Sequence, residues 1–149
     1  MYSLIQPGVP SDIINRLAQL SPDAKPRWGK MSVSQMLAHC QVPLQVAMGE
    51  KPLKRHWMGK LFGKMAKKQM LADAPVKKNL PTDPSYVVKD ERDFYKERQQ
   101  LQSLLQRFAR SGPAIIVIKE HPFFGPMTVD EMGVLFWKHL DHHLQQFNV

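Results

Sequence analysis

Hydrophobic residues recur at intervals of three and four along most of this chain, which is the period of amphipathic helices. A short helix is predicted over residues 11–20, where Ser11 can cap its first turn. A second helix is predicted from Ser32 to about Met48, because Ser32 and Gln35 have the spacing of a capping box. The first third of the chain is therefore expected to be helical.

The same period continues through the middle of the chain. A third helix is predicted from about Pro52 to Ala72, and a fourth from about Asp90 to Ser111. The expected apolar stripe of the third helix consists of Leu53, Trp57, Leu61 and Met65. Three prolines in residues 73–88 predict a long irregular connection between these two helices.

The last helix is predicted from Thr128 to about Phe147, since Thr128 and Glu131 form a second capping box. Before it, the β-branched residues 114–118 predict a short extended segment. Four main helices after a short N-terminal one favour an all-α fold, a four-helix bundle that occupies residues 1–149 as a single domain. Bundles build ligand sites from inward side chains on facing helices.

Composition narrows the class of protein. The chain has 149 residues, of which 43% are hydrophobic and 23% charged, as in ordinary globular proteins. Its longest aliphatic run, residues 114–118, is too short to span a membrane, and the N-terminus lacks the pattern of a secretory signal. The single cysteine, Cys40, excludes an internal disulfide bond and suits a reducing compartment. We therefore expect a cytoplasmic protein.

The net charge of +8 comes from one segment. Residues 51–78 contain nine lysines and arginines and one acid, whereas the remaining basic and acidic residues cancel. The candidate anion-binding side chains on the third helix are Lys60, Lys64, Lys67 and Lys68. This helix either is a solvated face or binds nucleic acid, an anionic membrane surface or an acidic cosubstrate. No nucleic-acid recognition motif accompanies the charge, so the expected partner is a small-molecule substrate rather than nucleic acid. The alternative function is a non-catalytic binding protein that uses the basic helix 51–72 for nucleic acid or an anionic surface.

Two histidines stand out on the apolar face of the last helix. His139 and His143 are four residues apart, so their Cβ atoms should lie roughly 5–6 Å apart. The apolar stripe that surrounds them consists of Met132, Leu135, Phe136, Leu140, Leu144 and Phe147. His39 in the second helix is the natural third ligand of a site for Zn²⁺ or Ni²⁺. The alternative is that all three are core or surface histidines paired with backbone and water.

Three motifs together carry a resemblance to a known superfamily. The first is Trp28 to Cys40, in which Leu-Ala-His stands just before the cysteine. The second is His121 to Gly125, and the third is the His-x-x-x-His within residues 138–147. In these motifs the chain resembles the DinB/YfiT-like superfamily, and more narrowly a bacterial branch without an assigned activity. The resemblance extends from Trp28 to the C-terminus.

The resemblance implies a four-helix bundle with a non-trivial helix order, often dimeric, which holds a divalent metal. The implied ligands are His39, His139 and His143. Members with assigned activities are transferases or isomerases that use low-molecular-weight thiols, and others resemble hydrolases. A thiol cosubstrate would bind the metal as a thiolate, whereas a hydrolase would activate water there. No inward acid is evident beside the histidines, which favours the thiolate chemistry.

Four further residues are expected in the pocket around the metal. His121 precedes the last helix in a turn-rich loop, and His142 lies at the edge of the apolar stripe. Trp28 introduces the second helix, and Cys40 follows His39 directly. For Cys40 the alternative is a buried small hydrophobe, and for the two histidines it is a structural or surface role.

Overall fold

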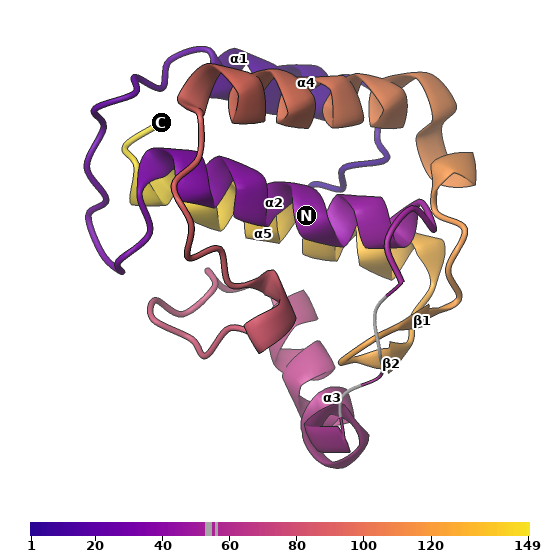
Figure 1. The fold of residues 1–149 in the computed structure, drawn as a ribbon. Coiled ribbons are helices and arrows are strands. Elements are labelled where there is room, and N and C mark those ends of the chain that lie inside the picture. The colour runs from indigo at the N-terminus through magenta and orange to yellow at the C-terminus, as the bar shows by residue number, and fades with distance from the viewer. Residues whose placement is uncertain (53–54, 56) are drawn as a thin grey trace.

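The computed structural model describes residues 1–52, 55 and 57–149, which are mostly helical (Figure 1). The α-helices are α1 (Val9–Leu17), α2 (Val33–Ala47), α3 (Trp57–Leu71), α4 (Phe94–Ser111) and α5 (Val129–Gln146). The short elements are the 3₁₀ turns η1 (Pro84–Tyr86) and η2 (Gly112–Ile115), and the strands β1 (Glu120–His121) and β2 (Gly125–Pro126). None of the described helices combines the length and apolar character that crossing a membrane requires. Leu53, Lys54 and His56, which belong to the predicted third helix, lie outside the described residues.

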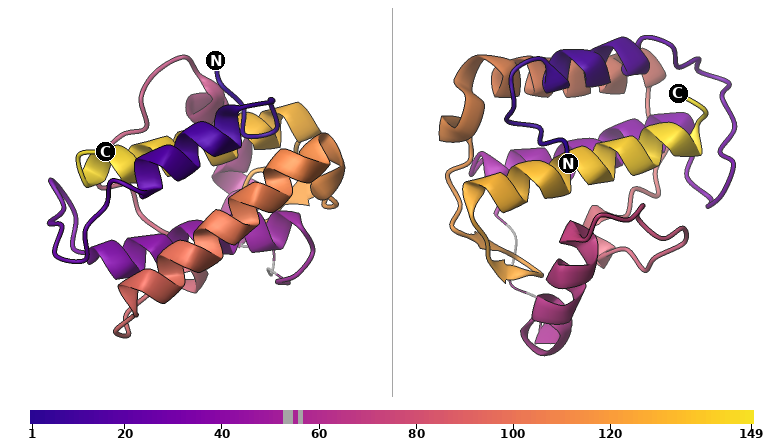
Figure 2. Two further views of the ribbon diagram at one scale, coloured as in Figure 1. Left: turned by 90° about the horizontal axis from the view of Figure 1, so that it is seen from above. Right: turned by 180° about the vertical axis from the view of Figure 1, so that it is seen from behind.

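Four helices surround the hydrophobic core in two layers. One layer contains α1 and α4, and the other contains α2 and α5 (Figures 1 and 2). Contacts link α1 with α4, α4 with α2, α2 with α5, and α5 with α1. The largest fully buried side chains are Phe108, Phe136, Leu4, Ile13, Leu17, Met36, Leu37, Leu44, Leu101, Leu105, Met132 and Leu140. The interface between α2 and α5 is therefore backed by a packed interior.

The N-terminal helix has a larger part in this core than its length suggested. It begins at Val9 rather than residue 11, because Pro10 suits a first turn and Gly8 takes a positive φ of 86° before it. Its Arg16 guanidinium donates to the Asp141 carboxylate on α5 at 2.8 Å. Ile13 is fully buried in the core, so α1 forms one wall of the interior.

Both predicted capping boxes are confirmed. Ser32 Oγ accepts from the Gln35 backbone N–H at 3.2 Å, and the Gln35 side chain accepts from the Ser32 N–H at 3.0 Å. Thr128 and Glu131 make the same reciprocal pair at 3.1 and 2.8 Å. The two helices that carry the histidines therefore begin where the sequence predicts.

The third helix differs from its prediction. Its expected apolar stripe does not face the core, because Trp57, Leu61 and Met65 are exposed and only Gly63 is buried among the described residues of α3. The helix instead packs through Gly63 and Gly59, where an added Cβ would collide with the carbonyl oxygen of Phe123. In Figure 1, α3 accordingly extends below the two layers beside the β1–β2 hairpin.

The extended segment is also displaced from its predicted position. Residues 114–118 begin in η2, because Gly112-Pro113 continues α4 into a 3₁₀ turn. The strands form later, where Glu120 pairs with Pro126 and His121 with Gly125. This hairpin lies immediately before α5 and carries a predicted pocket residue, His121.

Candidate metal centre

Three histidine side chains meet between α2 and α5. His39 comes from the middle of α2, and His139 and His143 are one turn apart on α5. One ring nitrogen from each lies within 4.8 Å of the other two. The ring centroid of His39 is 4.9 Å from that of His139 and 4.7 Å from that of His143. The structure therefore brings together the three residues that the sequence selects as metal ligands.

Hydrogen bonding fixes which nitrogen of His39 is free. Its Nδ1 lies 2.9 Å from the carbonyl oxygen of Tyr86 in η1. A carbonyl oxygen can only accept a hydrogen bond, so Nδ1 carries the ring proton and Nε2 carries a lone pair. Nε2 lies 2.9 Å from Nε2 of His139. His39 is therefore oriented as a neutral ligand that offers Nε2.

Two linked hydrogen bonds fix which ring nitrogen of His143 is free. The side-chain amide nitrogen of Gln146 donates to the carbonyl oxygen of Trp28 at 2.6 Å. Its amide oxygen consequently faces Nδ1 of His143, at 2.9 Å, and Nδ1 must donate the proton of that bond. The Nε2 atom of His143 is left with its lone pair free, as in His39.

One of the three nitrogen spacings is close to that of two ligands on a single metal ion. Two imidazoles bound to one tetrahedral zinc have nitrogens about 3.3 Å apart, because each Zn–N bond is roughly 2.0–2.1 Å long. The 2.9 Å between the Nε2 atoms of His39 and His139 is slightly shorter, a difference that small side-chain rotations remove. Three neutral nitrogen donors leave one tetrahedral position for water or substrate, which is the donor count of catalytic zinc sites.

The three imidazoles are neutral at physiological pH. Burial, and as a lesser cause electrostatic repulsion from His39, lower the pKa of His143 to about 3. Burial also holds the pKa of His139 well below its usual range, with the other histidines as a lesser cause. The pKa of His39 is lowered by burial, against an opposing effect of the hydrogen bond to Tyr86. A metal therefore competes with few protons for these nitrogens.

His121 lies close to this centre but has another task. Its Nδ1 accepts the backbone N–H groups of Phe123 at 3.1 Å and Phe124 at 3.2 Å, which closes the β1–β2 turn. Burial lowers the pKa of His121 to about 4, partly opposed by the negative charge of Asp83. The neutral ring thus stabilises the hairpin, and its nitrogen is not one of the three that converge.

His142 and Trp28 line a cavity on the neighbouring face of α5. Its volume is about 290 Å³, and the ring centroids of the two residues are 5.4 Å apart. The ammonium group of Lys78 lies 4.4 Å from the centroid of the Trp28 ring. The ring of His142 is also 5.1 Å from that of His143, although none of the three converging histidines lines the cavity itself.

Cys40 is a core residue. Its thiol is buried and donates to the sulfur of Met36 at 3.7 Å. Burial raises the pKa of the thiol well above its usual range, so the thiol stays protonated. Although it follows His39 in sequence, Cys40 behaves as a small hydrophobe.

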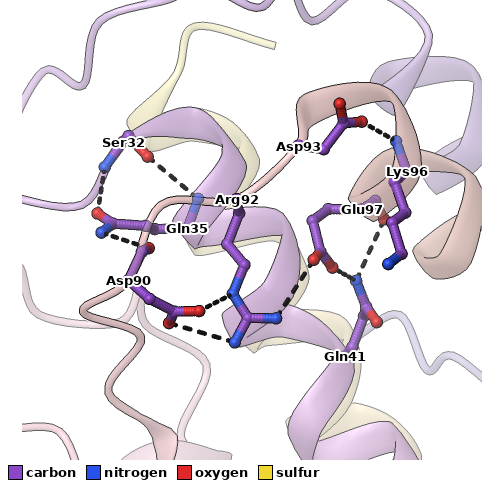
Figure 3. Close-up of polar contacts among 8 residues, drawn as sticks. All are labelled: Ser32, Gln35, Gln41, Asp90, Arg92, Asp93, Lys96 and Glu97. Atoms are coloured by element: carbon purple, nitrogen blue, oxygen red, sulfur yellow. Dashed lines mark hydrogen bonds and ion pairs between the residues drawn. The ribbon is translucent and has the colours of Figure 1, made fainter.

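The segment that supplies the Tyr86 carbonyl is held by a polar network that the sequence did not reveal (Figure 3). Glu97 on α4 is buried, and its carboxylate accepts from the Gln41 side chain of α2 at 2.7 Å. Arg92 bridges Glu97 at 3.4 Å and Asp90 at 3.0 Å. These bonds fix the end of the 73–93 connection against α2, the helix that carries His39.

Two other contributors to the site were also missed. Gln146 lies three residues after His143 on the same face of α5, and that spacing is a signal the sequence contained. Tyr86 acts through its backbone carbonyl, for which no side-chain pattern exists. Asp83 caps η1, where its carboxylate accepts from Ser85, and its charge acts on both His121 and Tyr86.

The four candidate anion-binding lysines do not behave alike. Lys60, Lys64 and Lys68 are exposed on α3. Lys67 instead pairs with the Glu131 carboxylate at 2.7 Å and donates to the Pro126 carbonyl at 2.9 Å. Lys67 therefore fastens α3 to β2 and to the start of α5, while the other three remain open to solvent.

Comparison with known proteins gives a family and no relative with a described activity. No curated protein and no solved structure matches the chain. One protein-family model matches residues 10–149, which include all five α-helices of the described structure except the first residue of α1. The chain therefore belongs to the family described as "Protein of unknown function (DUF1569)".

Proposed function

We propose that this protein is a divalent-metal-dependent enzyme that holds zinc or nickel through His39, His139 and His143. The observation that carries the proposal is the orientation of these side chains. Acceptors at Tyr86 and Gln146 hold the Nδ1 protons of His39 and His143, so that lone pairs at Nε2 face the same space. Buried imidazoles need a partner for each nitrogen, and a metal ion supplies a shared one.

We also infer that the fold is a DinB-like four-helix bundle. The support is the placement of the ligands, one histidine on the early helix α2 and two on the last helix α5. The packing of α1, α4, α2 and α5 around one core agrees with a bundle. In this assignment the short α1 is the fourth helix of the core, and α3 is an addition outside it.

A small-molecule substrate would bind in the cavity beside His142, whose ring adjoins that of the ligand His143. When bound, the metal would supply Lewis acidity that stabilises a thiolate or hydroxide. The only cysteine of the chain is protonated and buried in the core, so a reactive thiol must come from a cosubstrate. Lys78 and Trp28 at the cavity offer a cation and an aromatic face to a cosubstrate that carries carboxylates. Thiol transfer is accordingly the first chemistry to assay, and hydrolysis the second.

The direct test is elemental analysis of protein purified without a polyhistidine tag. We expect near-stoichiometric zinc or nickel in the parent, and loss of that metal in a His139→Ala/His143→Ala variant. The matched control is His142→Ala, which removes the adjacent histidine of α5 and should keep the metal. Circular dichroism should show the same helical signal for all three proteins.

Two results would contradict the proposal. One is a parent protein that stays metal-free after incubation with Zn²⁺ and with Ni²⁺. The other is a double variant that binds as much metal as the parent. In either case the three histidines are core polar residues that pair with each other and with their hydrogen-bond acceptors.

A further inference from the structure

The outward face of α3 exposes large apolar side chains. Trp57, Leu61 and Met65 are 66, 68 and 69% exposed, and Met58 and Phe62 are 41 and 48% exposed. At about 100° per residue, the five side chains occupy one arc of about 140° on the helix. We call these five residues the apolar arc. Side chains of this kind gathered on one face mark an interaction surface rather than ordinary scatter.

The apolar arc cannot turn toward the core, because the opposite face of α3 is already fixed. Gly59 and Gly63 lie so close to Phe123 that a side-chain carbon at either position would collide with its carbonyl oxygen. Lys67 adds its ion pair with Glu131 at the start of α5. The arc is therefore a permanent feature of the folded surface.

Positive charge borders the arc on one side. Three exposed lysines follow one another along α3 on the side of the arc that Trp57 occupies, namely Lys60, Lys64 and Lys68. They belong to the segment 51–78, which carries the whole net charge of the chain. The partner of this face must therefore accept apolar side chains and carry negative charge.

Charge and shape select among the partners. A second copy docked through the same face would bring two strongly basic segments together, at a cost in repulsion. Nucleic acid would engage the lysines and stack on the aromatic rings, but it offers nothing to Leu61, Met58 and Met65. An anionic lipid surface suits both the apolar arc and the lysines beside it. The boundary between headgroups and acyl chains can bury the apolar side chains, and the lipid phosphates can bind the ammonium groups.

We propose that α3 anchors this protein to anionic phospholipid membranes by lying in the plane of the interface. The apolar arc would enter the boundary between headgroups and acyl chains, while Lys60, Lys64 and Lys68 reach the lipid phosphates. At 15 residues α3 is about 22 Å long, too short to span a bilayer but sufficient to lie on one. The inference does not depend on the metal centre, and it holds equally if the protein is a non-catalytic binding protein.

The test is flotation of the full-length protein with two kinds of vesicle. One is phosphatidylcholine alone, and the other is phosphatidylcholine mixed with phosphatidylglycerol in equal parts. We expect binding only to the mixed vesicles, weakening as salt is added. The emission of Trp57 should shift to shorter wavelength on binding, and a Trp57→Phe variant should lose that shift.

Paired variants separate the two halves of the surface. Lys60→Gln/Lys64→Gln/Lys68→Gln should weaken binding on the order of 100-fold, because each lysine near an anionic surface contributes independently. The charge-matched control is Lys25→Gln/Lys30→Gln/Lys89→Gln, which removes three exposed lysines away from α3 and should bind like the parent.

A second pair tests the apolar arc. Leu61→Gln/Met65→Gln should also reduce binding more than tenfold, because two exposed apolar side chains that would enter the membrane are lost. Its control is Tyr95→Gln/Val117→Gln, at two positions of similar exposure outside α3. Circular dichroism should be unchanged in every variant, since all these side chains are exposed.

Three outcomes would overturn the proposal. Equal binding to both vesicles, or none to either, removes the anionic membrane as partner. Binding that is lost in the triple lysine variant but kept in Leu61→Gln/Met65→Gln indicates adsorption by charge alone, which nucleic acid would also show. A dimer by size exclusion that the Leu61→Gln/Met65→Gln variant dissociates shows that a second copy covers the arc.

Discussion

At the scale of single residues, Gln146 determines which nitrogen of His143 is free. Its amide links the Trp28 carbonyl to Nδ1 of His143, at 2.6 and 2.9 Å. We predict that Gln146→Ala lowers metal affinity about 10–100-fold, because the ring of His143 loses the acceptor that fixes its orientation and tautomer. Competition with a chromophoric chelator would measure this change.

The matched control is Gln145→Ala. That neighbouring side chain is exposed and donates to Asp141 at 2.7 Å rather than to a histidine. It should leave metal affinity unchanged. Equal effects of the two variants would show that Gln146 acts only through general stability.

His121 makes a separate, pH-dependent contribution to stability. Its folded pKa of about 4 lies below the value of about 6.5 in an unfolded chain. Between these values the unfolded chain binds the proton more readily, so stability is complete above pH 6.5 and falls as the pH drops toward 4. At pH 5 the loss from this residue should be about 2 kcal/mol, at 1.36 kcal/mol per pH unit.

We expect His121→Asn to remove that part of the acid sensitivity. An asparagine oxygen can accept the N–H groups of Phe123 and Phe124 as Nδ1 does, without a proton to gain. Urea unfolding of both proteins at pH 7 and pH 5 gives the difference in free energy of unfolding. An identical loss in parent and variant would mean that His121 does not titrate in this range.

How far the sequence predicts the site depends on the type of group. Helical spacing and an apolar stripe are enough to select His39, His139 and His143 from the sequence, and the structure brings them together. Their capacity to hold a metal stays a prediction. The role of the Tyr86 carbonyl could not be predicted, because no sequence pattern marks a backbone oxygen in an irregular segment. Its position depends on the tertiary path of residues 73–93.

At the scale of elements, replacing Gly63 of α3 by alanine has two opposing effects on stability. In an open helix, replacing glycine by alanine stabilises by about 1 kcal/mol. At Gly63 the new Cβ would collide with the Phe123 carbonyl, and overpacking of this kind costs typically 1–3 kcal/mol. We predict that Gly63→Ala lowers the free energy of unfolding or loosens α3, as measured by urea unfolding and by hydrogen exchange of the α3 amides.

The control for Gly63→Ala is Gln69→Ala, at an exposed position of the same helix. It changes helix propensity only slightly and should leave both measurements unchanged. A stabilised Gly63→Ala protein would mean that α3 can move away from the hairpin without cost.

The same helix shows why element positions were harder to predict than element types. A period of 3.6 indicates which residues share a face, as for Trp57, Leu61 and Met65, but it does not tell which way that face points. The small face formed by Gly59 and Gly63 proved to be the packing face. Capping boxes were better signals, because Ser32 and Thr128 satisfy their own helix ends whatever the tertiary contacts.

At the scale of the whole molecule, a metal would couple helices far apart in sequence. His39 and His139 are separated by 100 residues, on two helices that form one layer of the core. A ligand that binds only the folded state stabilises it by RT ln(1 + [L]/Kd), which is about 2.7 kcal/mol when the free metal is at 100 times Kd. For a chain of this length that corresponds to a rise in Tm of roughly 5–11 °C.

We therefore predict that zinc or nickel raises the melting temperature of the parent and of His142→Ala, and that a chelator reverses the rise. His139→Ala/His143→Ala should show no rise, because the unfolded chain and the variant lack the assembled donor set. Thermal unfolding followed by circular dichroism, at one protein concentration and pH 7, measures all three. A rise of the same size in the double variant would place the stabilising metal elsewhere on the molecule, and the histidines between α2 and α5 would then be structural.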